Sequence, residues 1–421
     1  MNEQTEKARA NLVRRDSLRR QAQSILHVND GRPHNKQHRT CWCGRHAVSE
    51  GPLPVMRRLD GSGARVGSVK TCGSVWACPV CASKVAEQRR KELTYAMEQH
   101  TAAGGHAYLL TFTFPHYRGQ TLAELMLPFS KARQSFQNSK GWKKVMGKDG
   151  TAGRVGSVTS LECTYGTANH WHPHLHMLVF CAPGAFGEGE ADEKGRLSSP
   201  AIDYFRGEWV RLLEKRGLVD ANNREWAGKY ALDVRGGKGA AEYVAKWGLV
   251  EELTLSHAKT GKRNTWGTND HYTPFQLLEI SKHDMENGGD GHATMAFREF
   301  VTEFDGKRML TWSPGLKAHF GIEDMEDEQA AAEPDLPLND EHPIGVIDQG
   351  QLTTLVSRGA YGRFLAFVAE FGHLDNPQQL IDDWIAAAQA VGGIRRKGNI
   401  LVDRLVIGGN GYWHEAEEIT A

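Results

Sequence analysis

The chain has 421 residues, of which 40% are hydrophobic, and its 51 basic and 51 acidic side chains balance to a formal net charge of zero. This length allows about two or three domains with at least one sizeable core. The balanced charge gives no global sign of a nucleic-acid partner. No apolar run is long enough to suggest a membrane span, and the first 20 residues lack the apolar core of a secretory signal. The composition therefore predicts a cytoplasmic protein.

Charge is distributed unevenly along the chain. Residues 1–39 are rich in Lys and Arg, and we expect a basic, flexible N-terminus, since nothing in them fixes a geometry for DNA. Residues 323–350 are mainly acidic and predict a linker. Residues 351–421 predict a small helical unit, because 359–370 and 377–390 have helical patterns.

Five of the seven cysteines lie between positions 41 and 81, which in a chain of this size indicates metal ligands rather than a disulfide framework. The Cys-Pro-Val-Cys element that ends at Cys81 has the tight spacing of a zinc knuckle. The predicted Zn²⁺ ligands are Cys72, Cys78, Cys81 and, as the fourth, Cys43 or Cys41, with His46 a weaker choice. Residues 40–98 are therefore predicted to form a zinc-binding module with a helix from Ala82, and a redox pair of thiolates is the alternative.

Arginines flank this module. Arg89 and Arg90 in the predicted helix could help to hold DNA phosphates, although exposed arginines need no such role.

The central part of the chain predicts alternating strands and helices. Strands are expected at 106–114, 155–165, 174–180 and 230–234, and helices at 121–138, at 202–215 and after the glycines of 236–239, with a loop at 184–200. The second and third strands are separated by a short turn and are expected to pair as antiparallel neighbours. A capping-box pattern with proline at the first helical position predicts a further helix after Thr273. The order predicts an α+β fold with an antiparallel sheet.

Four of the seven consecutive residues that end at His176 are histidines. Strand geometry sends His174 and His176 to the same face of a sheet, where two neutral imidazoles can bind one divalent ion. Glu162 on the paired strand could complete a mixed nitrogen and oxygen site that accepts Mg²⁺ or Mn²⁺. His172 is the competing third ligand, although the intervening proline interrupts the alternation. The alternative is that these are ordinary surface or core histidines, which the clustering makes less attractive.

A second group lies in Glu242-Tyr-Val-Ala-Lys-Trp247, where Tyr243, Lys246 and Trp247 fall about one helical turn apart. Tyrosine can be a covalent nucleophile, and attack on a phosphodiester gives a phosphotyrosine and a free hydroxyl. A metal ion would polarise the phosphate, and Lys246 could offset charge on its oxygens. Taken alone, Tyr243 would be interpreted as a half-buried packing residue. The histidine cluster reverses that preference.

Three motifs occur in order: Leu110-Thr-Phe-Thr-Phe-Pro115, His172-Pro-His-Leu-His-Met-Leu178 and Tyr243-Val-Ala-Lys246. Together they resemble the HUH rolling-circle replication initiators of bacterial plasmids and single-stranded DNA phages. The resemblance covers the chain from about Cys72 to Phe320 and is specific because the second and third motifs occur together.

The resemblance implies an HUH endonuclease domain at residues 99–322, an antiparallel sheet with the histidine pair on a central strand and the tyrosine on a facing helix. It implies that His174 and His176 bind the metal and that Tyr243 forms a 5′-phosphotyrosine, so that the released 3′-hydroxyl primes replication and the strand is rejoined at termination. Similar proteins also place a cysteine cluster before the catalytic domain. The implied partners are single-stranded and origin DNA in the bacterial cytoplasm and a host polymerase; a host helicase is expected because the chain has no Gly-Lys-Ser/Thr nucleotide loop.

One departure from the family concerns a second tyrosine, which some relatives carry one helical turn after the first and which is Trp247 here. Termination would then use a second subunit, or water activated by Glu242. Trp247 could stack on a nucleobase, but ordinary helix packing explains it equally well. The sequence leaves the oligomeric state open.

Other functions remain as alternatives from the sequence. A transposase or conjugative relaxase would use the same chemistry. A non-catalytic zinc protein that binds DNA would keep its activity in a Tyr243→Phe variant. A metal hydrolase with activated water would form no covalent adduct with DNA.

Overall fold

The computed structural model describes residues 3–187, 190–236, 271–289, 291–332 and 340–390, together with the backbone of four short strands between 395 and 415. The chain divides into two compact units. Unit 1 comprises residues 1–84 and 327–421, and unit 2 comprises residues 85–326. None of the described helices combines the length and the apolar character that crossing a membrane requires.

Unit 1 joins the two ends of the sequence. Its helices are α1 (Glu3–Leu26), two short 3-10 helices (His34–Lys36 and Arg39–Trp42), the start of α2 (Pro79–Ala102), α12 (Asp327–Ala332), α13 (Gln349–Ser357), α14 (Tyr361–Phe371) and α15 (Pro377–Ala390). Its strands are β1 (Leu53–Arg58), β2 (Ala64–Val66), β11 (Glu341–Ile347) and the short β12 (Arg395–Arg396), β13 (Asn399–Ile400), β14 (Leu405–Ile407) and β15 (Trp413–Glu415).

The core of unit 1 lies between a small antiparallel sheet and three helices. Strand β1 runs in the middle of the order β11-β1-β2, with Leu53 opposite Ile347. Buried side chains of this sheet pack with those of α13, α14 and α15, where the rings of Phe364 and Trp384 lie 5.4 Å apart. Residues 341–347 were predicted to belong to an acidic linker, and this prediction was wrong, because they form the edge strand β11.

The N-terminal segment was predicted to be flexible, and the structure corrects this prediction. Residues 3–26 form the continuous helix α1, which packs against α14 in unit 1. Gly362 is required at this contact, because a Cβ there would lie 2.7 Å from the Cβ of Asp16. The Asp16 carboxylate accepts a hydrogen bond from the Gly362 amide at 3.1 Å. The sequence pattern failed here because α1 buries charged side chains beside a short apolar stripe that is confined to its last turns.

A buried ion pair holds α1 in place. Arg19 is 3% exposed, and its guanidinium donates to Asp16 at 2.5 Å and lies 5.1 Å from the centre of the Tyr361 ring. Burial lowers the pKa of Arg19, but the charge of Asp16 and of other neighbouring groups raises it by more, so that the pKa lies above its ordinary value. The guanidinium therefore stays charged inside the unit, where its carboxylate partner is indispensable.

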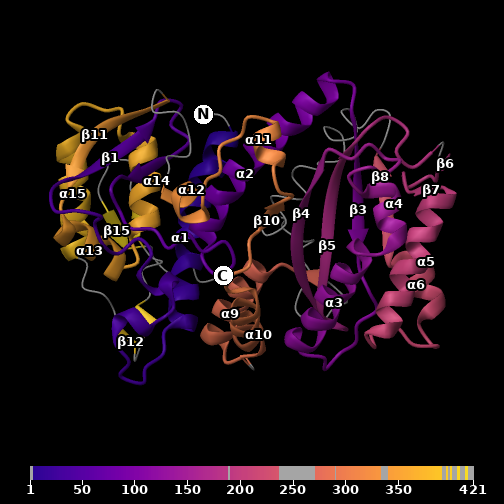
Figure 1. Ribbon diagram of the computed structural model, residues 1–421. Helices are drawn as coiled ribbons and strands as arrows, with labels where there is room; N and C mark the ends of the chain where they lie inside the picture. The colour runs from indigo at the N-terminus through magenta and orange to yellow at the C-terminus, as the bar shows by residue number, and fades with distance from the viewer. Residues whose placement is uncertain are drawn as a thin grey trace. The chain divides into compact units, whose positions relative to one another are not determined.

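Unit 2 is built on a six-stranded antiparallel sheet of order β10-β4-β5-β3-β8, with β9 paired to β4 (Figure 1). Its strands are β3 (His106–Phe112), β4 (Gly156–Gly166), β5 (His170–Cys181), β6 (Glu190–Ala191), β7 (Leu197–Ser198), β8 (Leu232–Gly236), β9 (His271–Tyr272) and β10 (Leu310–Trp312). Besides the rest of α2, its helices are α3 (Leu122–Gln137), α4 (Lys140–Met146), α5 (Pro200–Lys215), α6 (Arg224–Tyr230), α9 (Pro274–Asn287), α10 (His292–Phe304) and α11 (Leu316–His319). The predicted α+β fold with an antiparallel sheet and flanking helices is confirmed.

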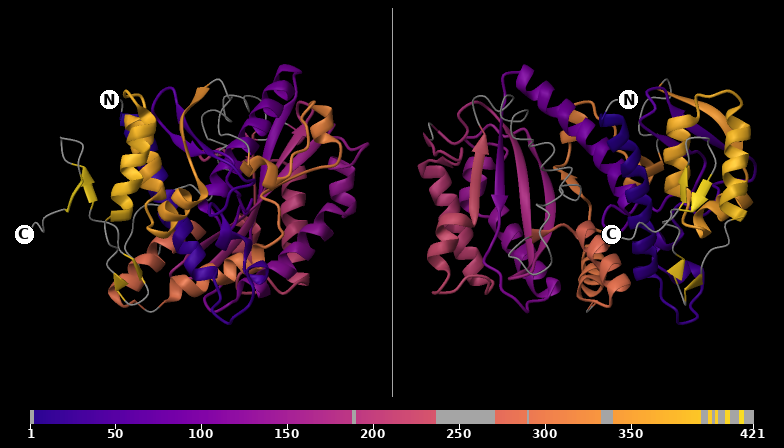
Figure 2. Two further views of the ribbon diagram at one scale, coloured as in Figure 1. Left: turned by 90° about the vertical axis from the view of Figure 1, so that its left-hand side faces the viewer. Right: turned by 180° about the vertical axis from the view of Figure 1, so that it is seen from behind.

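One face of the large sheet is apolar and is covered by helices. Phe112 of β3 meets Phe136 of α3 and Trp209 of α5, with ring centroids 5.3 and 5.1 Å apart. Trp171 of β5 stacks on Phe300 of α10. Figure 2 shows α5 and α6 on the same side of this sheet when it is seen from behind. This aromatic core leaves the other face of the central strands for polar side chains.

We predict that Asp16→Ala destabilises the protein by about 3–5 kcal/mol, because it leaves the Arg19 charge buried without a partner. Chemical denaturation followed by circular dichroism measures this change. Asp30→Asn is the control, because Asp30 pairs with Arg32 at the surface and its loss should leave the transition unchanged. A transition for Asp16→Ala that coincides with the wild type would contradict the packed position of α1.

Candidate metal centres

A fixed strand register gathers polar side chains on the second face of the unit 2 sheet, opposite the aromatic core. In the β4–β5 hairpin, Glu162 lies opposite His174 and Ser160 lies opposite His176. On the other side of β5, Thr111 of β3 is also opposite His176. Residues directly opposite each other in an antiparallel pair share a face, so these side chains point to the same side. The predicted pairing of Glu162 with the histidine strand is thus present.

The three predicted metal ligands meet at this place. Nε2 of His174 is 3.3 Å and Nε2 of His176 is 3.8 Å from Oε2 of Glu162. One ligand atom from each of the three residues lies within 4.8 Å of the other two. Glu162 is 6% exposed and His176 is 4% exposed. A carboxylate this buried needs a compensating charge.

Hydrogen bonds fix the orientation of both imidazoles. Nδ1 of His174 lies 3.2 Å from the carbonyl oxygen of His172, and since a carbonyl only accepts, this nitrogen carries the proton. Nδ1 of His176 is 2.9 Å from the hydroxyl of Thr111. Each ring thereby turns Nε2 toward Glu162, which is the arrangement in which outer partners hold metal-binding histidines.

The geometry requires a positive charge between the two imidazoles and the Glu162 carboxylate. In neutral His174 the Nε2 lone pair faces a carboxylate oxygen, which is repulsive unless a second proton or a cation lies between them. The other oxygen, Oε1 of Glu162, is buried and has no hydrogen-bond partner among the described residues. A divalent cation satisfies the lone pairs and the orphaned oxygen together, so Glu162, His174 and His176 fit a metal ion that takes nitrogen and oxygen ligands.

His172 supports the centre without joining the three ligand atoms. The strand continues through Pro173, which lies opposite Cys163, so the proline does not end the alternation. Nε2 of His172 instead bonds the hydroxyl of Thr113 at 2.7 Å, and its ring stacks on His116 at 4.5 Å. Burial, then the neighbouring imidazoles, lower the pKa of His172 to about 2, so this ring is neutral.

Sequence reasoning missed the residues that orient the histidines. Thr111 and Thr113 alternate along Leu110-Thr-Phe-Thr-Phe-Pro115, and this alternation was the signal that could have placed both hydroxyls on the histidine face. Asp233 of β8 was also missed; it lies opposite Thr111, and one of its carboxylate oxygens is buried without a partner among the described residues.

The cysteine cluster of unit 1 forms a second candidate centre. The sulfur atoms of Cys43, Cys72, Cys78 and Cys81 all lie within 4.8 Å of one another. The Sγ of Cys43 is 3.5 Å from that of Cys81 and 3.6 Å from that of Cys78. All four residues are buried, as in a structural zinc site with four cysteine ligands. Of the alternatives for the fourth ligand, the geometry favours Cys43.

Helix α1 supports the loop that carries Cys43. The side-chain amide of Gln23 donates to the carbonyl oxygens of Cys43 at 2.9 Å and Thr40 at 3.1 Å. Cys41 is buried nearby, but its sulfur faces the carbonyl oxygen of Gln23 at 3.9 Å instead of the cluster. The N-terminal helix is therefore part of the wall of this candidate zinc centre.

The remaining predicted site residues have different outcomes. Tyr243, Lys246, Glu242 and Trp247 lie outside the described residues. Arg89 is buried, and its guanidinium donates to Glu92 and to the carbonyl oxygen of Met325. The predicted phosphate contact would need this guanidinium at the surface. Arg90 is partly exposed and forms an ion pair with Glu87 at 2.8 Å.

Comparison with known proteins finds similarity to replication proteins. A model of the replication protein family matches residues 64–192. The protein rep of Streptomyces lividans is 26% identical over 315 residues, which cover 65% of this chain and 68% of that protein. The chain is thus similar to replication proteins over these residues. No solved structure matches it.

A second relative matches a shorter part of this chain. The neomycin resistance protein of Streptomyces cyanogenus is 29% identical over 181 residues, 37% of this chain and 41% of that protein. The segment matched by the family model contains Glu162, His174, His176 and three of the four clustered cysteines, so both candidate centres involve the part of the chain that the family shares.

We predict that this protein binds Mn²⁺ through the histidine centre and that Thr111→Val weakens this binding by about 10- to 100-fold, because it removes the bond that orients His176. His174→Ala and Glu162→Gln should abolish it. Isothermal titration calorimetry measures each affinity, with His373→Ala, an exposed histidine of unit 1, as the control. Wild-type affinity in Glu162→Gln would contradict the assignment.

For the cysteine centre we predict that Cys43→Ser loses zinc whereas Cys41→Ser retains it, because only the sulfur of Cys43 lies in the cluster. Atomic emission spectroscopy of the purified variants gives the metal content, and the melting temperature should fall only in Cys43→Ser. Equal zinc content in the two variants would exclude Cys43 as the fourth ligand.

Proposed function

We propose that this protein is a rolling-circle replication initiator of the HUH type, which nicks single-stranded origin DNA and joins it covalently to Tyr243. The observation that carries the proposal is the group of Glu162, His174 and His176, with both Nε2 atoms turned to one buried carboxylate. The match of residues 64–192 to the replication protein family supports DNA as the proposed substrate, because an initiator acts on DNA at an origin.

The centre is proposed to hold Mg²⁺ or Mn²⁺, which when bound polarises the scissile phosphate and stabilises charge on its oxygens. Thr111 and the His172 carbonyl keep the two imidazoles oriented. Neutral His172 adds no positive charge of its own beside the centre. These residues hold the phosphate-binding position rigid, which is how a preorganised site lowers a barrier.

The proposed chemistry is a transesterification. The Tyr243 hydroxyl oxygen attacks phosphorus, the bond from phosphorus to the 3′-oxygen breaks, and the proton from tyrosine ends on that oxygen. The products are a 5′-phosphotyrosine and a 3′-hydroxyl, and the reverse reaction rejoins a strand. Lys246 is proposed to offset charge on the phosphate, and Glu242 to take part in proton transfer. Tyr243 follows Gly236, the last residue of β8, closely in sequence, and the chain between them spans at most about 25 Å.

The proposed biological partners follow from this role: plasmid or phage origin DNA and a host helicase and polymerase. The four clustered cysteines are proposed to bind structural Zn²⁺ and to hold the loops that precede the sheet domain.

We predict that wild type, but not Tyr243→Phe, forms a covalent adduct with single-stranded DNA in Mn²⁺, because the substitution removes only the nucleophilic oxygen. A pooled library of end-labelled oligonucleotides supplies the unknown target, and denaturing electrophoresis separates the adduct from free DNA. Tyr95→Phe, an exposed tyrosine on α2, is the matched control.

The other outcomes of this assay select other functions. Cleavage without an adduct would indicate hydrolysis by activated water, and an adduct in Tyr243→Phe would place the nucleophile elsewhere. Binding without cleavage throughout the library would favour a non-catalytic DNA-binding protein.

A further inference from the structure

Large aromatic side chains are exposed on the short helix α6 of unit 2. Trp226 is 43% exposed and Tyr230 is 41% exposed, and their ring centroids lie 5.5 Å apart. They follow Asn223 by three and seven positions and therefore share one face of the helix. Exposed rings gathered on one helix face indicate a binding surface, because burying them would stabilise the protein.

A chain of contacts connects this face to the histidine centre. The side-chain amide of Asn223 donates to the hydroxyl of Tyr117 at 2.9 Å, and Tyr117 is itself 52% exposed. The preceding residue, His116, stacks on His172, whose ring centroid is 5.0 Å from that of His174. The aromatic face therefore begins beside the loop that borders the candidate metal ligands.

Positive charge accompanies the rings. Nζ of Lys229 lies 5.4 Å from the centre of the Tyr230 ring, and exposed Arg118 follows Tyr117 in sequence. Neither cation has a carboxylate partner within the described ranges. The single carboxylate in α6, Glu225, is one residue from Trp226 and points to a different side of the helix.

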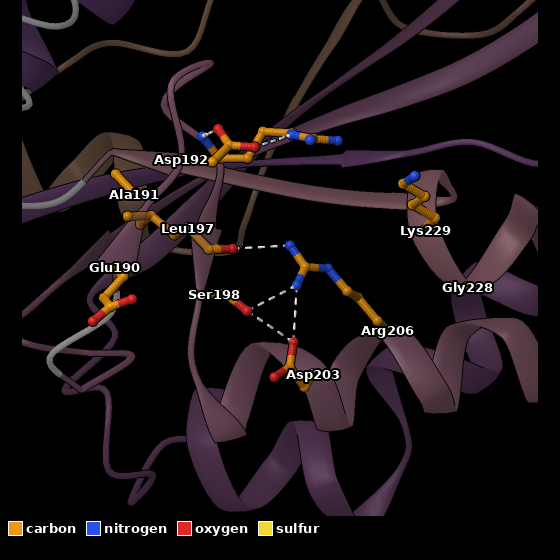
Figure 3. A pocket seen from close by; sticks show the side chains of 10 residues that line it. Glu190, Ala191, Asp192, Leu197, Ser198, Asp203, Arg206, Gly228 and Lys229 are labelled. Atoms are coloured by element: carbon orange, nitrogen blue, oxygen red, sulfur yellow. Dashed lines mark hydrogen bonds and ion pairs between the residues drawn. The ribbon is translucent and has the colours of Figure 1, made fainter.

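A pocket of about 440 Å³ lies beside α6 and has Lys229 in its lining (Figure 3). Its wall includes Arg206, which donates to Asp203 at 2.8 Å and to the carbonyl oxygen of Leu197 at 2.8 Å, so its charge is used inside the pocket. Arg196 is paired with Asp192 in the same way. Lys229 stands at the α6 side of the pocket without such a bond in Figure 3. Of these three cations, Lys229 beside Tyr230 is therefore the one available to bind a ligand.

We propose that Trp226, Tyr230 and Tyr117 form a stacking surface that holds single-stranded DNA next to the histidine centre, with Lys229 and Arg118 contacting its phosphates. This inference rests on the proposed function for its substrate class. Stacking requires unpaired bases, whose flat faces match aromatic rings, whereas bases of a duplex are already stacked on one another. Rings interleaved with unpaired cations suit a polyanion with aromatic bases better than an apolar protein partner.

The test measures binding without cleavage. Fluorescence anisotropy of labelled oligothymidine with the full chain, in buffer without added Mg²⁺ or Mn²⁺, is expected to give dissociation constants raised about 5- to 100-fold by Trp226→Ala and by Tyr230→Ala. Trp226→Phe and Tyr230→Phe keep a ring and should bind almost as wild type. Tyr95→Ala removes an equally exposed tyrosine from α2 and should change nothing.

A second measurement locates the contact directly. Oligonucleotides with 5-iodouracil crosslink to aromatic side chains under ultraviolet light, and mass spectrometry should find the crosslinks in the peptides of α6 and of Tyr117. Alanine variants that bind oligothymidine as tightly as wild type, or crosslinks confined to other peptides, would overturn the proposal. Equal losses on a hairpin duplex would also overturn it, since stacking predicts a loss confined to single strands.

The oligothymidine binding assay and the covalent adduct assay together distinguish the stacking surface from tyrosine-dependent nicking. Loss of oligothymidine binding together with an absent adduct would retain the stacking surface and reject tyrosine-dependent nicking. An adduct in wild type together with unchanged binding by both alanine variants would retain the nickase and reject the surface.

Discussion

The register of the β4–β5 hairpin is the constraint on which the candidate site depends. It sets a carboxylate opposite an imidazole and a second imidazole two residues along the same face. A shift by one residue would send Glu162 to the aromatic core, where Phe112 and Trp209 pack, and would bring apolar side chains to the polar face. The large hydrophobic cost of that shift holds the register, so the apolar face of the sheet indirectly fixes the polar one.

Much of this arrangement could be predicted from the sequence because it depends on local alternation. The strands at 155–165 and 174–180 and their turn were recognisable, and the capping box at Thr273 was confirmed. The common face of His174 and His176 follows from strand geometry alone. The role of Thr111 required knowing that β3 is the next strand beside β5, and a single sequence does not reveal which strands become neighbours.

The predictions that failed concern contacts between distant parts of the chain. Strand β11 is short and contains Pro343 and Gly345, which weaken any strand pattern, and it is defined by its pairing with β1. Helix α1 has only a short apolar stripe near its end, and Arg9, Asp16 and Arg19 are among its other buried residues. Charges that are neutralised by distant partners look like solvated charges in a sequence. The sequence also could not decide between Cys41 and Cys43 as the fourth zinc ligand, because only the folded conformation of their loop distinguishes them.

The contact between Asp16 and Gly362 joins residues 346 positions apart in the chain. A ribosome that makes this protein releases α1, the clustered cysteines and all of unit 2 before α14 exists. Unit 2 is one continuous segment and can complete its sheet during synthesis, whereas the core of unit 1 has to wait for the last part of the chain. Helix α1 and the cysteine loops that it supports are then made well before α14, the helix against which α1 packs. The sheet domain is therefore the first part of the newborn chain able to reach its final form.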